Sequence, residues 1–215
     1  MLQPCIDKKQ CLCYLCILSY MRRKSVETLR TFIALLLPDE ALGALEREQQ
    51  CLAGRAGGVK WVKPGAIHLT LAFLGSTPAA AIARISTLVQ ETAARFKPID
   101  FTLQGIGAFP NERNPKVVWA GLRGCAGLLE LQRLIAVGLE ELGFQKDRKP
   151  FAAHITLGRV RDGSGRSALR ALLAERRDFM FGEFQAGRLA LIESDLQPAG
   201  PVYTIVHESR LQHHR

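Results

Sequence analysis

Apolar residues recur along the chain with two different periods, which predicts strands interspersed with helices. Helical spacing, with apolar side chains at i, i+3 and i+4, appears at residues 38–54, 78–96, 125–142 and 164–176. Apolar runs of strand length occur at residues 29–37, 59–62, 67–74, 99–107, 116–122, 151–157, 179–185, 189–195 and 202–208. Several strands follow one another without a helix between them, which favours an α+β fold over a doubly wound parallel sheet.

Turn and capping residues predict where the helices begin. Pro38, followed by Asp39 and Glu40, is expected at the first turn of the first helix, with the acids near its positive end. Ser76 or Thr77 is expected to cap the second helix, because either hydroxyl could accept a hydrogen bond from a free backbone N–H group.

Two predicted strands carry the same pattern, His-x-Thr-Leu, at residues 68–71 and 154–157. Side chains of a strand alternate between its faces, so the histidine and threonine of each copy should share one face. Strict alternation places Phe73 and Arg159 on the other face, with the core leucines. The residues expected on the histidine face are His68, Thr70 and Ala72 in the first copy and His154, Thr156 and Gly158 in the second.

The two halves of the sequence repeat the order strand, helix, motif strand, helix. This repetition predicts one domain of two duplicated lobes over residues 27–215, and 215 residues are ample for a core. If the lobes face each other, both histidine faces line one cleft between two sheets. Residues 1–26 differ from the rest and are expected to be an extension, disordered or translated from a start codon assigned too early.

A pair of histidines facing one cleft can perform acid–base catalysis. Neutral imidazole accepts a proton and imidazolium donates one near physiological pH. One histidine can therefore activate the attacking group while the other protonates the leaving group. Two threonine hydroxyls with nearby Arg or Lys would form a site of phosphate size. A single such histidine is more often a structural residue, and the duplication of the pattern is what favours function.

Other chemistries find little support in the sequence. There is no P-loop, GxGxxG motif or serine elbow, and no Asp or Glu adjoins either motif, so a metal site there would lack ligands. We expect no metal and no cofactor. Cys11, Cys13 and Cys16 form a CxCxxC run without a second cluster at zinc spacing, which favours free thiols in a reducing cytoplasm. The apolar run at residues 11–20 is too short to span a bilayer, so no membrane association is expected.

The positive charge of the chain is concentrated in two stretches. Its formal net charge is +9, of which residues 1–26 carry +4. Residues 146–177 contain nine Lys and Arg against three Asp and Glu. This second stretch flanks the second motif, where it would attract a phosphate or a polyanion. A solvated basic surface is the alternative interpretation.

Taken together, the two motifs and their context resemble the two-histidine (HxTx) phosphoesterase superfamily, and within it the RNA 2′,3′-cyclic phosphodiesterase family, also called the 2′-5′ RNA ligase family. The similarity extends from about residue 29 to residue 203 and includes Arg-Thr-Phe-Ile-Ala-Leu at residues 30–35 and Val-Val-Trp-Ala-Gly-Leu at residues 117–122. The resemblance implies a bilobal α+β fold of two antiparallel sheets, flanked by helices, around a central cleft. It also implies metal-independent hydrolysis of a terminal 2′,3′-cyclic phosphate on RNA to a 2′-phosphate. We expect a monomer.

The resemblance implies a role for each motif residue. His68 would protonate the leaving 3′-oxygen and His154 would activate water, while Thr70 and Thr156 would hold phosphate oxygens. Further candidates for substrate contacts are Arg159, Lys116, Trp61 and Tyr203.

These four candidates rest on different grounds. Lys116 replaces a frequent arginine of the family, which keeps the charge but loses the bidentate fork. Arg159 matches the family's arginine, yet it leaves the core face only if Gly158 permits a bulge. Trp61 could stack on a base, whereas Phe73 is assigned to packing.

Two alternative functions remain open. One is another two-histidine activity, on 2′-5′ linkages or small cyclic nucleotides, or ligation as the reverse reaction. The other is an RNA-binding module without catalysis, although binding alone would not require both histidines.

Overall fold

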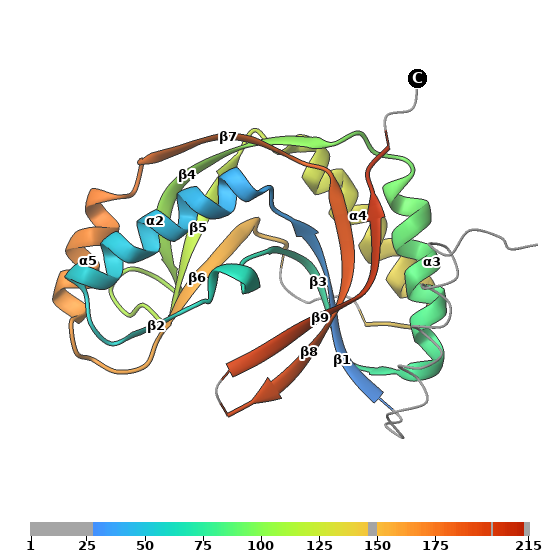
Figure 1. Cartoon of the computed structure of the whole chain (residues 1–215), viewed down its shortest axis with the longest axis horizontal. Coiled ribbons are helices and arrows are strands. Elements are labelled where there is room, and N and C mark those ends of the chain that lie inside the picture. Colours follow the sequence, from blue (N-terminus) through green and yellow to red (C-terminus); the bar gives the residue numbers. More distant parts are fainter. Residues whose placement is uncertain (1–27, 146–149, 199, 213–215) are drawn as a thin grey trace, which may run out of the picture.

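The computed structural model describes residues 28–145, 150–198 and 200–212, and this part of the chain folds into two antiparallel sheets with helices packed around them (Figure 1). The helices are α2 (Asp39–Arg55), α3 (Ile82–Ala93), α4 (Ala126–Glu141) and α5 (Arg166–Glu175). In spatial order, the first sheet consists of β3 (Leu69–Pro78), β1 (Thr28–Leu36), β8 (Arg188–Gln197) and β9 (Gly200–Arg210). The second consists of β2 (Val59–Trp61), β6 (His154–Val160), β5 (Val117–Arg123), β4 (Ile99–Phe109) and β7 (Met180–Ala186).

This architecture confirms the α+β prediction and the two antiparallel sheets. The expectation for residues 1–26 lies outside the described residues. The first sheet combines strands from both ends of the domain, since β1 lies between β3 and β8. The two motif strands, β3 and β6, belong to different sheets and contact each other.

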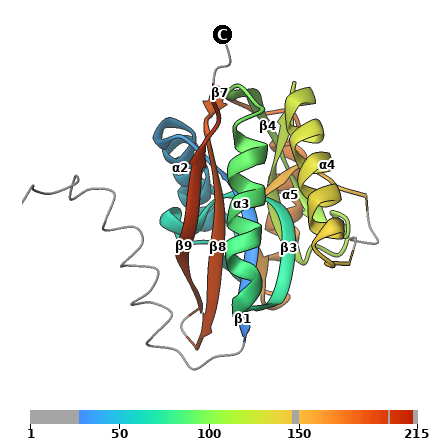
Figure 2. The ribbon, with the colours of Figure 1, turned by 90° about the vertical axis from the view of Figure 1, so that its right-hand side faces the viewer.

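Each helix lies where its apolar stripe predicts. In α3 the buried residues Ile82, Ile85, Val89 and Ala93 follow helical spacing, and the helix lies across one face of the first sheet (Figure 2). Helix α4 packs beside α3 and contacts β3, whereas α2 contacts α5 and β7 of the second sheet. The helices therefore cover the core faces of the sheets.

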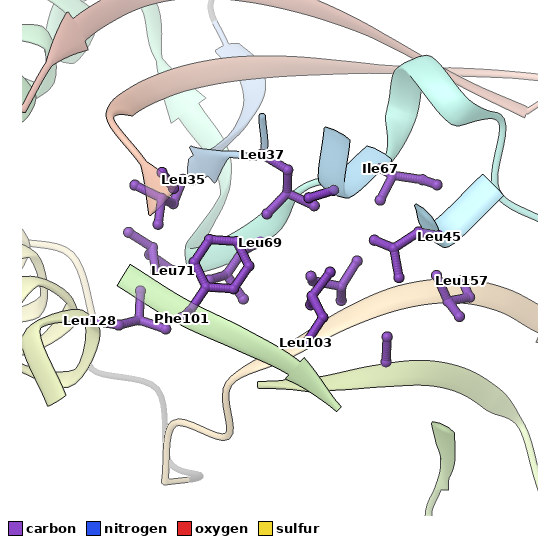
Figure 3. Close-up of a cluster of buried hydrophobic side chains, with 14 of the residues drawn as sticks. Leu35, Leu37, Leu45, Ile67, Leu69, Leu71, Phe101, Leu103, Leu128 and Leu157 are labelled. Carbon is purple, nitrogen blue, oxygen red and sulfur yellow. The ribbon is translucent and has the colours of Figure 1, made fainter. Parts of the chain in front are cut away.

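One large hydrophobic core joins both sheets (Figure 3). Leu69 and Leu71 from β3 meet Leu157 from β6 there, and all three are almost completely buried. Leu45 of α2 and Leu128 of α4 belong to the same cluster. Because the leucines of both motifs lie in this core, the histidine and threonine of each motif are directed away from it.

The predicted cap of the second helix is wrong. Strand β3 continues to Pro78, and α3 begins at Ile82 without a side-chain cap hydrogen bond. Thr77 is fully buried instead, where its hydroxyl shares a hydrogen bond of 2.7 Å with that of Thr31 in β1. Thr77, which capping propensity alone would assign to the helix, thus belongs to a cross-strand pair of hydroxyl groups.

Both motif strands contain an extra residue at the same position of the motif, and β3 contains a second one, Leu74, further along. In β3, Thr70 pairs with Ala34 of β1 whereas Ala72 pairs with Ile33, so Leu71 has no opposite residue. Such a β-bulge shifts the side chains that follow it to the other face, as far as the next bulge.

The second copy repeats this arrangement. In β6, Thr156 pairs with Trp119 of β5 whereas Gly158 pairs with Val118, so Leu157 has no opposite residue. Both bulges lie directly after the threonine, so the two strands change face at equivalent points.

The bulges overturn part of the alternation prediction. Ala72 and Gly158 lie on the core faces, not on the histidine faces, since they pair with the buried residues Ile33 and Val118. Phe73 pairs with Phe32 on the histidine face and is 70% exposed, so its assignment to core packing is wrong.

Candidate active site

The two motif histidines have the same local geometry. His68 directly precedes β3 and His154 is the first residue of β6, so both strands begin later than the apolar runs predict. The Nδ1 atom of His68 lies 2.8 Å from the carbonyl oxygen of Ala66, and that of His154 lies 2.7 Å from the carbonyl oxygen of Ala152. A carbonyl can only accept, so Nδ1 of each ring carries the proton and Nε2 is left to exchange one.

Aromatic rings hold both imidazoles in place. His68 stacks on Phe32, with ring centroids 4.7 Å apart, and meets the ring of Tyr203 edge-on at 5.3 Å. His154 meets Phe109 edge-on at 4.9 Å. A ring fixed by a backbone carbonyl and by packing is preorganised for proton transfer.

Burial distinguishes the environment of His68. Removal of the ring from water lowers the pKa of His68 from its usual value, and the hydrogen bond to Ala66 opposes this only in part. The free protein therefore favours neutral His68, and a bound anion would favour its protonated form. A lowered pKa also makes the imidazolium a stronger acid once it has formed.

The two histidine faces converge, because residues of both sheets meet around Tyr203. Burial raises the pKa of Tyr203 in β9, while the positive charges of Arg159 in β6 and Arg30 in β1 act in the opposite direction. Lys60 of β2 pairs with Arg159, and its Nζ would lie 3.2 Å from a Cβ added to Gly200. The positive charges of Arg159 and Arg30, one from each sheet, thus act on the tyrosine beside His68.

A groove of about 910 Å³ opens beside His154 on the second sheet. It is lined by Ala153, which precedes the histidine, and by Gly121, which pairs with it. A Cβ on Gly107 would stand 2.3 Å from the ring of Trp119, so this ring lies against a bare stretch of β4. The lining also includes charged side chains of both signs: Glu112, Arg113, Arg123, Arg177 and Asp178.

The four predicted substrate contacts differ in where their side chains lie. The bulge in β6 returns Arg159 to the histidine face, where its side chain is exposed. The sequence made a substrate contact by Arg159 conditional on such a bulge. Tyr203 contacts His68 directly. Trp61 instead pairs with Gly158 and packs against the core, so it lies on the opposite face from Arg159. Lys116 is exposed at the turn before β5, where its backbone N–H donates to Phe109.

Sequence reasoning missed several residues around the histidines. Phe32 and Phe109 contact the rings. Phe32, as an apolar residue of a predicted strand, could not be distinguished from core, and Phe109 lies beyond the strand predicted at residues 99–107, because β4 continues to Phe109. The alternation that puts Phe32 on the same face as the charged Arg30 was a usable signal in the sequence. The pairing of Ala34 with Thr70 shows that this face is the histidine face.

No group of three or more His, Cys, Asp or Glu side chains suited to a metal ion occurs within residues 28–145, 150–198 and 200–212. Within the same ranges, none of the helices combines the length and the apolar character needed to cross a membrane.

Two antiparallel sheets that each present an anchored histidine and a threonine two residues later define the class predicted from the sequence, a two-histidine phosphoesterase. The model of the 2′-5′ RNA ligase superfamily matches residues 37–198, and the chain belongs to this family. An RNA 2′,3′-cyclic phosphodiesterase of Methanothermobacter thermautotrophicus is 32% identical over 182 residues, covering 85% of this chain and 98% of that protein.

Solved structures agree with this placement. A protein of Thermus thermophilus superimposes with a TM-score of 0.75 at 34% identity, over 85% of this chain and 98% of that one. The LigT protein of E. coli, crystallised with 3′-AMP, superimposes with a TM-score of 0.69 at 26% identity, over 87% of this chain and all (100%) of that one.

Proposed function

We propose that this protein is an enzyme that hydrolyses a terminal 2′,3′-cyclic phosphate on RNA to a 2′-phosphate. The observation that carries the proposal is the pair of equivalent histidines, each with Nδ1 anchored on a carbonyl and Nε2 left to exchange a proton. The family membership and the name of the Methanothermobacter relative support the substrate class. Both histidines come from one chain, so a monomer would hold a complete site, and a cytoplasmic location would supply RNA.

The proposed reaction transfers one proton at each histidine. His154 takes a proton from water as the water oxygen attacks phosphorus, and His68 gives its proton to the 3′-oxygen as the bond between phosphorus and that oxygen breaks. The product carries the phosphate on the 2′-oxygen. The negative charge of the phosphate raises the protonated fraction of His68, which burial otherwise lowers. No step requires a metal ion.

The charge that develops on the phosphate is stabilised by neighbouring donors. The hydroxyls of Thr70 and Thr156 share the histidine faces and would donate to phosphate oxygens. Arg159 would provide a bidentate guanidinium contact beside Tyr203, and exposed Lys116 would contribute charge at longer range.

The body of the RNA would occupy the groove beside His154. Trp119 offers a flat ring there, and base stacking on aromatic side chains tolerates any sequence. Phe73, exposed on the other histidine face, offers a second ring for a base. A site that holds RNA on both sides of the phosphate should favour an oligonucleotide over a cyclic mononucleotide.

A panel of four substrates tests the proposal against its alternatives. The panel contains an oligoribonucleotide ending in a 2′,3′-cyclic phosphate, the corresponding 2′,3′-cyclic mononucleotide, a 3′,5′-cyclic nucleotide and a 2′-5′-linked dinucleotide. We expect the first to have the highest kcat/KM and the second a higher KM. Preference for either of the last two would move the function to another two-histidine activity. Binding without turnover of any of the four would identify a non-catalytic RNA-binding module.

A further inference from the structure

The bulge that directs Arg159 to the histidine face is held by a glutamine from a distant helix. Gln49 of α2 is 95% buried, since only 5% of its surface is exposed. Its Nε2 donates to the carbonyl oxygen of Leu157, the extra residue of β6, at 2.8 Å, and to that of Val62 at 3.0 Å. The backbone N–H of Val62 donates to the same Leu157 carbonyl at 2.8 Å. The amide therefore ties the bulge to the segment that follows β2.

The first motif has a counterpart in the same place. Gln132 of α4 directs its Nε2 to the carbonyl oxygen of Leu71, the extra residue of β3, at 3.5 Å. This contact is longer than an ordinary hydrogen bond and only partly buried, so it is the weaker of the two. A helix glutamine thus meets the bulge carbonyl in both halves, which makes a chance contact a poor explanation.

We infer that Gln49 is a positioning residue that selects the bulged register of β6 and thereby presents Arg159 to the substrate phosphate. The alternative is a regular strand, in which Gly158 would occupy the histidine face and Arg159 the core face. Both donors hold the Leu157 carbonyl on the side of β6 that faces β2, so they fix the backbone at the residue that β5 leaves unpaired and thereby favour the bulged form. The inference rests on the proposed function, in which Arg159 contacts the phosphate.

The burial of Gln49 supports the same role. Gln50, the next residue of α2, is exposed, whereas Gln49 is buried and its amide contacts two backbone carbonyls. A polar side chain so deeply buried is stable only with its hydrogen bonds made, so the core tolerates one geometry of the amide. In that geometry Nε2 of Gln49 donates to the carbonyl oxygens of Leu157 and Val62.

A double-mutant cycle separates positioning from general stabilisation. The variants are Gln49→Met, which keeps the length of the side chain and removes its donors, Arg159→Ala and the combination of both. Gln50→Met is the matched control, because it makes the same change one residue away on the exposed side of α2. The two readouts are kcat/KM on an oligonucleotide with a 2′,3′-cyclic phosphate, and calorimetric binding of inorganic phosphate, which requires no turnover.

Arg159→Ala should lower kcat/KM by about a hundredfold or more, the usual effect of removing one donor to a developing charge. Gln49→Met should lower it by about tenfold to a hundredfold, as expected when a binding group is misplaced. The double variant should be no worse than Arg159→Ala alone, since the residues act as a unit. Phosphate binding should show the same non-additivity, and Gln50→Met should match the wild type.

Several outcomes would overturn the inference. Losses that multiply in the double variant would show that Gln49 acts on the whole fold and not through Arg159. Full activity and full phosphate affinity in either Gln49→Met or Arg159→Ala would also overturn the inference. If Gln49→Met does not fold, Gln49→Asn takes its place in the cycle, because it keeps the amide but withdraws it by one methylene group. If the wild type binds phosphate with this pattern but hydrolyses no cyclic phosphate, the proposed function fails while the role of Gln49 stands.

Discussion

The assignment of His68 as the acid predicts which substrate will rescue its removal. His68→Ala should lower kcat on a 2′,3′-cyclic phosphate by about two to four orders of magnitude, the usual effect of a positioned proton-transfer group. This loss corresponds to about 3–5 kcal/mol of transition-state stabilisation. A phosphodiester with a p-nitrophenolate leaving group needs no protonation there, so it should restore most of the rate of His68→Ala and none of that of His154→Ala.

The structure shows that unfolding would not explain such a loss. The substitution removes two ring contacts, with Phe32 at 4.7 Å and with Tyr203 at 5.3 Å. At about 0.5–1.5 kcal/mol for each ring pair and about the same for the lost hydrogen bond to Ala66, the cost is about 1.5–4.5 kcal/mol. A folded domain has about 5–15 kcal/mol of stability, so the variant should stay folded at 25 °C with a modestly lower Tm.

Steady-state kinetics on both substrates, with thermal unfolding of each variant, form the assay. His207→Ala is the matched control, since His207 is a partly buried histidine that bonds Ser209 outside the motifs. Rescue of His154→Ala in place of His68→Ala would reverse the acid and base labels. Wild-type activity in either single variant would refute the two-histidine mechanism.

Three further outcomes are expected. Burial lowers the pKa of His68 below its usual 6.5. The contribution of neutral His68 to stability is therefore complete above pH 6.5 and is lost as the pH falls toward the folded-state pKa. In thermal melts at a series of pH values, His68→Asn should flatten this decline in Tm on the acid side. Affinity for RNA should weaken with salt as counterions are released, and Arg166→Ala with Arg170→Ala, both exposed on α5, should reduce the slope; an unchanged slope would make them an ordinary solvated surface. Activity should survive exhaustive chelation, and a loss that zinc or manganese restores would contradict the acid–base mechanism.

Much of the fold follows from local patterns in the sequence. The stripe of Ile82, Ile85 and Val89 predicts α3, and alternation around the paired motifs predicts that the histidines leave the core. The family resemblance adds the two antiparallel sheets, which no single segment reveals.

The positions of Phe73 and Arg159 could not be predicted in the same way. Alternation is a property of an unbroken strand, and the bulges depend on neighbours that are remote in sequence. The donor at the Leu157 carbonyl comes from Gln49, 108 residues away. Whether Arg159 faces substrate or core is therefore decided by tertiary hydrogen bonds, and the residue Gly158 only permits the outcome.

The most direct test of the central claim is product analysis in isotopically labelled water. The chelated enzyme is incubated in H₂¹⁸O with an oligoribonucleotide that ends in a 2′,3′-cyclic phosphate, and the product is identified by mass spectrometry and ³¹P NMR. Attack of water with departure of the 3′-oxygen predicts a 2′-phosphate that carries one ¹⁸O atom, formed about a hundredfold or more slowly by His68→Ala and by His154→Ala. A 3′-phosphate, or unchanged cyclic phosphate with the wild-type chain, would contradict the account.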